Sequence, residues 1–485
     1  KDLDSSEKSW KDEPMTQIAR STSLLGSICL LMAAIPTAQG GVNPPFPDIA
    51  GPEIWVDGPD NVQPDPPNFP DVAVDNEGRR IHVWSGFNVT DQYDIYVRRF
   101  DPAGNPLDDP TRVNTTIESN QQKPRVAVSG DGSFLVIFQS NEIVPGQVIR
   151  RFVVRSQAYN ANGDTVGGEQ LLSTTLPLEP TDTYADVAAL RTSDGSPGGY
   201  AVVWFSKTAS GSDTNQSIEG CMVDQNGVPG VQFQVNSTIG AVENWSSVTE
   251  MYDGGFLAVW VAQGTGEIRG RRFNAAGGAI GPDFRLNSVD NAAPTSETEA
   301  AIGWDGRVMV VWEDNGSEDP PLPPSNTEIF GRMFDADLNP LGPEFRINNL
   351  FEGIQDDPRV ADFGPVGFLV AWSSDTVSAG TDPTQSIEAR VVSGPGSFDA
   401  DGDGANDNQV QYNVWESGGQ NRPQSHGWYG RLATNWQSQG LGDETGLVIV
   451  GRDIEYCLFC DDFEWHSPAS PGSLWRWTST LGLVP

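Results

Sequence analysis

The stretch AAIGWDGRVMVVWEDN at residues 300–315 decides the fold, together with EIFGRMFDADLNPLGPEFRIN at residues 328–348, which follows a polar, proline-rich loop. In this unit an apolar run ends in an aromatic residue, and an Ile-x-small-Arg-like run comes next. The unit recurs along the chain at intervals of 52 to 66 residues. Self-similarity at such a period indicates a repeat architecture. The recurring aromatic residues are Trp84, Phe138, Trp204, Trp260, Trp312, Trp372 and Trp436.

Four extended segments are visible in each unit. An Asp-Gly turn such as Asp305-Gly306 separates the first two, and this dipeptide between apolar runs is a strong hairpin signal. The third segment reads I-x-G-R-x-F, and the fourth reads G-P-[ED]-F-R-[LI]-N, as at Gly281–Asn287 and Gly342–Asn348. Four short strands rich in Val, Ile, Phe and Trp, in a unit of roughly 58 residues, are typical of a β-propeller blade.

The last unit has no fourth segment of its own, but an orphan copy stands near the start of the chain. This copy is Gly51–Asp57, GPEIWVD, which matches GPEFRIN. We therefore expect an all-β, seven-bladed propeller of four-stranded antiparallel blades over residues 41–456, closed by pairing of this N-terminal strand with the final blade. The arrangement resembles the circular closure of seven-bladed propellers such as WD-repeat proteins, although the WD dipeptides are missing.

The chain has 485 residues and a formal net charge of −37. This charge excludes nucleic acid as an expected partner, because phosphate binding needs a basic surface. It predicts a well-solvated surface, and the alternative interpretation is attraction of Ca²⁺ or of a basic partner.

Residues 1–40 are expected to lie outside the mature protein. Met15–Gly40 contains a basic residue, Arg20, then an apolar run at Leu24–Ile35 that is too short to span a bilayer, then a small-residue cleavage site. This pattern predicts a signal peptide preceded by upstream residues. The expected location is secreted or at the cell surface, with no transmembrane helix in the mature chain.

Residues 457–485 differ in composition from the repeats and form a separate C-terminal tail. Cys457 and Cys460 in this tail are expected to form a disulfide in an oxidising compartment, and a zinc half-site is the alternative. The segment Cys460–Glu464, CDDFE, resembles the short F-x-D-G-F-E tails of secreted proteins from Gram-negative bacteria. This resemblance implies a sorting or surface-retention signal, and the alternative is an extra strand or a frayed end.

One loop has the spacing of a calcium site. Its alternate carboxylates converge on a hard cation, Gly404 allows the bend, and Val410 replaces the Glu that an EF-hand needs at its twelfth position. The loop resembles the calcium loops of FG-GAP and VCBS repeats, which implies a structural Ca²⁺ site, and an unoccupied acidic turn is the alternative. The predicted ligands are Asp399, Asp401, Asp403, Ala405 and Asp407.

Signals for catalysis are few. The sequence has three histidines, of which His82 is expected to face outward from a strand, and it has no G-x-S-x-G, H-E-x-x-H or P-loop motif. No carboxylate pair is singled out, so no catalytic or cofactor-binding residue is predicted. A repeated arginine in the third strands, as at Arg271 and Arg332, is interpreted as structural and as pairing with acids like Glu313 on the neighbouring strand.

Two functions remain open. The first is a secreted or cell-surface binding scaffold without catalysis, whose partner is an extracellular protein or a glycan. The alternative is an extracellular carbohydrate-active hydrolase or lyase, which needs two carboxylates, or a carboxylate with Arg or Tyr, converging near the ring axis. The long loops that follow the aromatic residues emerge on one face, where a ligand is expected. A concave cluster with perturbed pKa values there would favour the enzyme.

Overall fold

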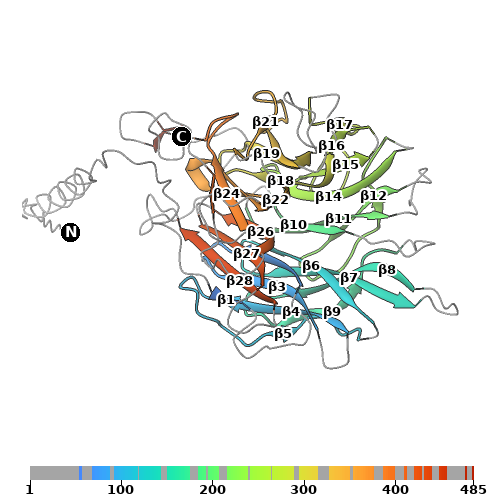
Figure 1. The fold of residues 1–485 in the computed structure, drawn as a ribbon. Coiled ribbons are helices and arrows are strands. Elements are labelled where there is room, and N and C mark those ends of the chain that lie inside the picture. Colours follow the sequence, from blue (N-terminus) through green and yellow to red (C-terminus); the bar gives the residue numbers. More distant parts are fainter. Residues whose placement is uncertain are drawn as a thin grey trace, which may run out of the picture. The chain divides into compact units, whose positions relative to one another are not determined.

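The structure is a computed structural model, in which the chain divides into one unit of residues 1–43 and another of residues 44–485. All described residues belong to the second unit (Figure 1). The described residues are 54–56, 68–87, 92–117, 119–143, 150–174, 184–192, 195–206, 216–238, 241–263, 265–288, 294–314, 327–349, 353–375, 386–398, 409–411, 420–428, 431–439, 447–455, 476–477 and 483–484.

The described residues of the second unit form seven four-stranded antiparallel sheets, and six of them consist of four consecutive strands. In each of these six the first strand is innermost and the fourth is the outer strand, which has two residues in every sheet except that of β9, where it has seven. The six sheets are β2 (Asn68–Val74), β3 (Arg80–Phe87), β4 (Tyr93–Phe100), β5 (Thr111–Arg112); β6 (Gln121–Val128), β7 (Phe134–Ile143), β8 (Arg150–Tyr159), β9 (Thr165–Leu171); β10 (Ala185–Arg191), β11 (Pro197–Ser206), β12 (Ser217–Val223), β13 (Phe233–Gln234); β14 (Val242–Glu250), β15 (Phe256–Gln263), β16 (Glu267–Phe273), β17 (Phe284–Arg285); β18 (Pro294–Ile302), β19 (Val308–Asp314), β20 (Glu328–Phe334), β21 (Phe345–Arg346); and β22 (Gln355–Asp362), β23 (Phe368–Ser374), β24 (Ser386–Val392), β25 (Val410–Gln411).

The remaining four-stranded sheet is composite. It joins β26 (Gln420–Trp428), β27 (Arg431–Gln439) and β28 (Leu447–Glu455) to the N-terminal strand β1 (Ile54–Trp55), in which Ile54 lies opposite Gly451 of β28. The innermost strand β26 packs against β22 on one side and β2 on the other, so the composite sheet closes the ring. The expected all-β propeller of four-stranded antiparallel blades is confirmed. A short pair, β29 (Arg476–Trp477) and β30 (Leu483–Val484), and a 3₁₀ turn, η2 (Gly364–Val366), complete the described elements.

The repeated aromatic residues form the core between the sheets. Trp84, Trp204, Trp260, Trp312 and Trp372 are almost completely buried. Trp312, for example, lies in a cluster that takes residues from two neighbouring sheets, including Leu257 and Val310. Burial of these large apolar side chains supplies most of the free energy that holds the sheets together.

The repeated arginine of the third strand has a different partner from the expected one. Its guanidinium donates to a backbone carbonyl that follows the outer strand of the preceding sheet, not to an acid of the neighbouring strand. The reason is that carbonyl groups at an edge strand have no ladder partner on their outer side. The four described bonds are Arg98 Nη1 to Val56 O at 3.1 Å, Arg271 Nη1 to Val235 O at 2.8 Å, Arg332 Nη1 to Leu286 O at 2.7 Å and Arg390 Nη1 to Ile347 O at 2.6 Å.

His82 does not face solvent, which corrects the sequence-based expectation. It is 1% exposed and packs edge-on against the ring of Phe100, with ring centroids 5.2 Å apart. Burial lowers its pKa to about 3. The physical reason is that the second strand of each sheet lies between two other sheets, so both of its faces are buried.

Candidate functional site

Seven polar residues occupy one register position on the seven innermost strands. Each lies opposite the residue that directly precedes the repeated aromatic, as Asp71 lies opposite Val83 and Glu299 lies opposite Val311. All seven line one cavity enclosed by the innermost strands. We call this set the axial ring. Its members are Asp71, Arg125, Asp186, Ser247, Glu299, Arg359 and Gln424.

Backbone irregularities set the direction of the side chains that precede the axial ring. The strand register shifts immediately before the ring position in six of the seven innermost strands. Two residues before the ring position, Phe69, Lys123, Trp245 and Asp357 have φ values of 51° to 53°. Such values are uncommon outside glycine, and strained residues of this kind concentrate at functional sites. These four side chains line a second cavity.

The axial ring therefore lies between two cavities. The first cavity has a volume of about 200 Å³ and extends along the innermost strands beyond the ring. The second, which we call the mouth, has a volume of about 170 Å³ and lies at the strand starts, on the side from which the long loops emerge. Arg125, Arg359 and Gln424 line both cavities.

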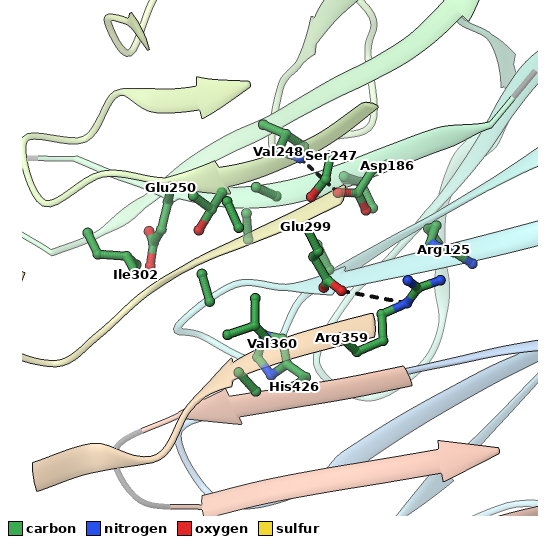
Figure 2. A pocket seen from close by; sticks show the side chains of 18 of the residues that line it. Arg125, Asp186, Ser247, Val248, Glu250, Glu299, Ile302, Arg359, Val360 and His426 are labelled. Atoms are coloured by element: carbon green, nitrogen blue, oxygen red, sulfur yellow. Dashed lines mark hydrogen bonds and ion pairs between the residues drawn. The ribbon is translucent and has the colours of Figure 1, made fainter. Parts of the chain in front are cut away.

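Glu299 is the central acid of this arrangement. Figure 2 shows it between Asp186 and Arg359. Its Oε2 lies 3.6 Å from Arg359 Nε, while Arg359 Nη2 lies 2.5 Å from Oε2 of Glu297. Burial raises the pKa of Glu299 to about 8, because the opposing effect of Arg359 is outweighed and the negative charge of Asp186 adds to the rise. Glu299 is therefore mostly protonated at neutral pH.

The other two acids of the axial ring are tied to neighbouring sheets. Asp71 Oδ2 accepts a hydrogen bond from the Val126 backbone N–H at 2.7 Å, and Asp186 Oδ2 accepts one from that of Val248 at 2.8 Å. Burial raises the pKa of Asp71 to about 6, although the charge of Arg125 opposes this rise. Glu299 and Asp71 thus have pKa values that the surroundings raise to different extents, to about 8 and about 6. Carboxyl groups with separated pKa values are the usual basis of acid–base chemistry.

The mouth combines aromatic rings with charged groups. The Lys123 ammonium lies 3.6 Å from the centroid of the Tyr184 ring and 5.7 Å from that of Phe69. The Tyr184 and Trp245 rings are in contact, with centroids 4.3 Å apart. Glu297 also lines this cavity. Aromatic surfaces with a few convergent polar groups are the usual lining of small-molecule sites.

His426 has a structural role. Its Nδ1 accepts a hydrogen bond from the Val74 backbone N–H at 3.1 Å, which joins the composite sheet to the first one. Burial lowers its pKa to about 4, so the ring is neutral at physiological pH.

The site residues predicted from the sequence are not among these. The calcium loop, residues 399–408, and both Cys457 and Cys460 lie outside the described residues. Within the described part of the chain, no cluster of three His, Cys, Asp or Glu side chains is arranged to hold a metal ion. Cys221 is a buried free thiol. In the same described part, helices long and apolar enough for a membrane span are absent.

The sequence contains a signal that would have identified the axial ring. NFPDVAV at residues 68–74 and QKPRVAV at residues 122–128 align on the repeated valines, and a charged residue precedes the first valine in both. A charged residue at a repeated position on an innermost strand points toward the axis. The signal is weak because the residue differs in kind from unit to unit.

No family model matches the sequence, and no curated protein matches it. Solved structures do resemble the fold. One is a protein of unknown function from Dyadobacter fermentans, at 12% identity and a TM-score of 0.45, over 83% of this chain and 97% of that one. Another is an α-L-arabinofuranosidase from Fusarium graminearum, at 10% identity and a TM-score of 0.46, over 84% and 98%. A third is an ulvan lyase, at 10% identity and a TM-score of 0.48, over 82% and 97%. Function is therefore argued from the residues of this chain.

Proposed function

We propose that this chain is a carbohydrate-active enzyme that hydrolyses a glycosidic bond at the axial ring. The observation that carries the proposal is the convergence of Asp71, Asp186 and Glu299 with Arg125 and Arg359 on one cavity at the ring axis. The sequence-based argument required such a convergence for an enzyme.

Glu299 is the proposed proton donor to the leaving oxygen. A general acid works best when its pKa lies near the working pH, and burial raises the pKa of Glu299 to about 8. Asp186, which lies beside Glu299 in Figure 2, is the proposed second carboxylate, acting on the opposite side of the scissile bond as base or nucleophile.

The mouth is the proposed entry for the sugar chain. Sugar rings have apolar C–H faces and hydroxyl edges, which fit the aromatic surfaces of Tyr184 and Trp245 and the charged groups of Glu297 and Asp357. The strained backbone at Trp245 and Asp357 directs these side chains into the mouth.

The test is a panel of polysaccharides assayed for new reducing ends, with Glu299→Gln as the variant. The wild type should release products, and the variant should lose roughly 10²-fold or more of that rate, as expected when a general acid is removed. Glu77→Gln, on the exposed turn between β2 and β3, is the matched control and should keep full activity.

Three results would count against hydrolysis. Equal rates for Glu299→Gln and wild type would remove the proton-donor role. Products with an unsaturated sugar and no added water would assign a lyase instead. Binding of a glycan without any product would leave a binding protein.

A non-catalytic glycan-binding protein is the second candidate. The observation that favours it is that Asp71 and Asp186 each accept a backbone hydrogen bond from the neighbouring sheet, which is a structural use of both carboxylates. A glycan array followed by the reducing-end assay separates the two functions.

Export and calcium binding remain proposals. N-terminal sequencing of exported material should give a start near Gly41, and a start within residues 1–14 would contradict a signal peptide at Met15–Gly40. Calorimetry should show one Ca²⁺ site that is lost in the double variant Asp401→Ala, Asp403→Ala. Identical melting curves in EDTA and in Ca²⁺ would leave that loop as an acidic turn.

A further inference from the structure

Two arginines of the axial ring are equivalent in position but not in partners. Arg359 is 6% exposed, and its guanidinium is paired with Glu297 at 2.5 Å and with Glu299 at 3.6 Å. Arg125 occupies the same register position on β6. Its one hydrogen bond to the described residues runs from Nη1 to the Pro124 carbonyl at 3.1 Å, and no described carboxylate lies within 4.0 Å of its guanidinium.

The surroundings of Arg125 leave its guanidinium facing the cavities. It is half-buried and lines both the mouth and the inner cavity. The ring acids of the two adjacent sheets, Asp71 and Asp186, direct Oδ2 to the backbone N–H groups of Val126 and Val248 instead. Lys123, on the same strand, adds a second positive charge at the mouth, with its ammonium above Tyr184. Strand β6 thus brings two cations to the ligand side of the ring.

A guanidinium has five N–H donors in a fixed fork that fits carboxylate and sulfate oxygens two at a time. The charge of Arg125 acts on Asp71 and Glu299 but forms an ion pair with neither, so its fork is open to an anion that enters the cavity. Lys123 adds attraction for the same anion. Arg359 adds little, because its charge is already paired with that of Glu297.

We infer that the glycan bound at the mouth carries an anionic group, either the carboxylate of a uronic acid or a sulfate ester, and that this group pairs with Arg125. This inference rests on the proposed function, because it names the substrate class of the same site. Arg125 is a binding residue that selects acidic over neutral sugar chains.

Calorimetry with the full chain tests the pairing by binding rather than by turnover. The probes are a uronic-acid polysaccharide and its carboxyl-reduced form, and a sulfated polysaccharide and its desulfated form. Wild type should bind one charged probe at least about 10-fold more tightly than its neutral counterpart, and the charged probe that shows this preference identifies the source of the anion.

Arg125→Gln should abolish that preference and leave the affinity for the neutral probe unchanged. Arg125→Lys should keep part of it, since the charge remains but the fork is lost. Arg112→Gln, an exposed arginine at the outer strand β5, is the control and should retain the full preference. If Arg125→Gln does not fold, Arg125→Lys and the salt dependence of wild-type binding provide the same comparison.

Equal binding of charged and neutral probes by the wild type would overturn the inference, as would an equal loss of affinity for both probes in Arg125→Gln. Charge-selective binding without product would reject the enzyme and keep the anion site. Product release from neutral glycans alone would reject the anion site and keep the enzyme.

Discussion

The repeated arginines of the third strands, which we call the outer arginines, and the residues of the axial ring both occupy repeated positions. The arginines share one residue type, whereas the residues of the axial ring do not. In the third strands, Arg98, Arg271, Arg332 and Arg390 each donate from Nη1 to a backbone carbonyl of the preceding sheet. On the innermost strands, the seven equivalent positions hold five residue types, and no common side-chain bond links them. Even the two arginines among them differ, since Arg359 is paired with glutamates and Arg125 is not.

We interpret this difference as a division, within one repeat, between positions that join neighbouring sheets and positions that line the cavity. A contact between neighbouring sheets uses the same residue type in most copies, because most copies meet the same kind of neighbour, although Gln157 and Cys221 occupy the equivalent position in β8 and β12. The ligand that we propose at the axis would contact each of the seven positions from a different direction, so these positions can differ in residue type. Divergence at a repeated position is therefore the informative feature, and the predictions below test it in order of decreasing effect.

Removing the closing strand should have the largest effect. Deletion of residues 41–58 removes β1, uncovers the outer edge of β28 at Val450 and Gly451, and removes Val56 from its cluster with Trp84 and Phe100. We expect the melting temperature to fall by roughly 10 °C or more, or cooperative unfolding to be lost. Calorimetry decides this, with deletion of residues 1–40 as the control. Equal melting of the two truncated chains would show that β1 does not close the ring.

Truncating a repeated aromatic should cost less than losing the closing strand. Trp312→Ala leaves a cavity between two sheets and should lower the free energy of unfolding by about 3–5 kcal/mol. Val231→Ala, at a side chain that is 89% exposed, is the control and should change the free energy little. Urea denaturation measures both, and a small effect of Trp312→Ala would mean that the repeated aromatics do not dominate the core.

The outer arginines should affect stability without affecting ligand binding. Arg332→Ala removes the bond to the Leu286 carbonyl and should lower the free energy of unfolding by about 1–3 kcal/mol, because that carbonyl loses a charged donor. Arg125→Gln should change stability by less than Arg332→Ala and should change binding of charged glycans instead. Denaturation and calorimetry on both variants sharpen the comparison. Loss of glycan binding in Arg332→Ala would show that the outer arginines do not act on stability alone.

The smallest effect concerns pH. Burial raises the pKa of Glu299 to about 8 in the folded protein, against an ordinary value of 4.5 in the unfolded chain. Between these values the unfolded chain binds fewer protons, so this carboxyl lowers stability as pH rises from about 4.5 through 8. Glu299→Gln should therefore stabilise the protein at pH 7, and the gain should vanish near pH 4.

Melting curves of Glu299→Gln and wild type between pH 4 and pH 9 provide the measurement. A constant difference across this range would show that the Glu299 carboxyl titrates normally. Because Glu299 is the proposed proton donor, we also expect the rate of hydrolysis to fall above about pH 8, where its carboxyl group loses the proton.

The repeats made most of the fold predictable from the sequence. The aromatic residue, the Asp-Gly turn and the G-P-[ED]-F segment are local patterns, and GPEIWVD at residues 51–57 indicated the pairing that Ile54 and Trp55 make with β28. Gly306 shows why the turn pattern is reliable, since its φ of 87° is a conformation that side chains disfavour.

The candidate site was not predictable in the same way. Glu299 and Asp186 lie on different sheets, and the raised pKa of Glu299 depends on burial that only the closed ring creates. No spacing along the chain links them. The partners of the outer arginines and the burial of His82 were also misjudged, because both depend on how neighbouring sheets pack rather than on the pattern within one sheet.

The composite sheet has a consequence for how the chain folds during synthesis. Strand β1 leaves the ribosome first, but its partner β28 begins only at Leu447, so the pair forms after every other sheet has been made. Each of the other six sheets draws its strands from one continuous stretch, whereas this one joins Trp55 to Val450 and so closes a much longer loop. Joining the two ends is therefore expected to be the slow step of folding, during which an incomplete edge remains open to other chains.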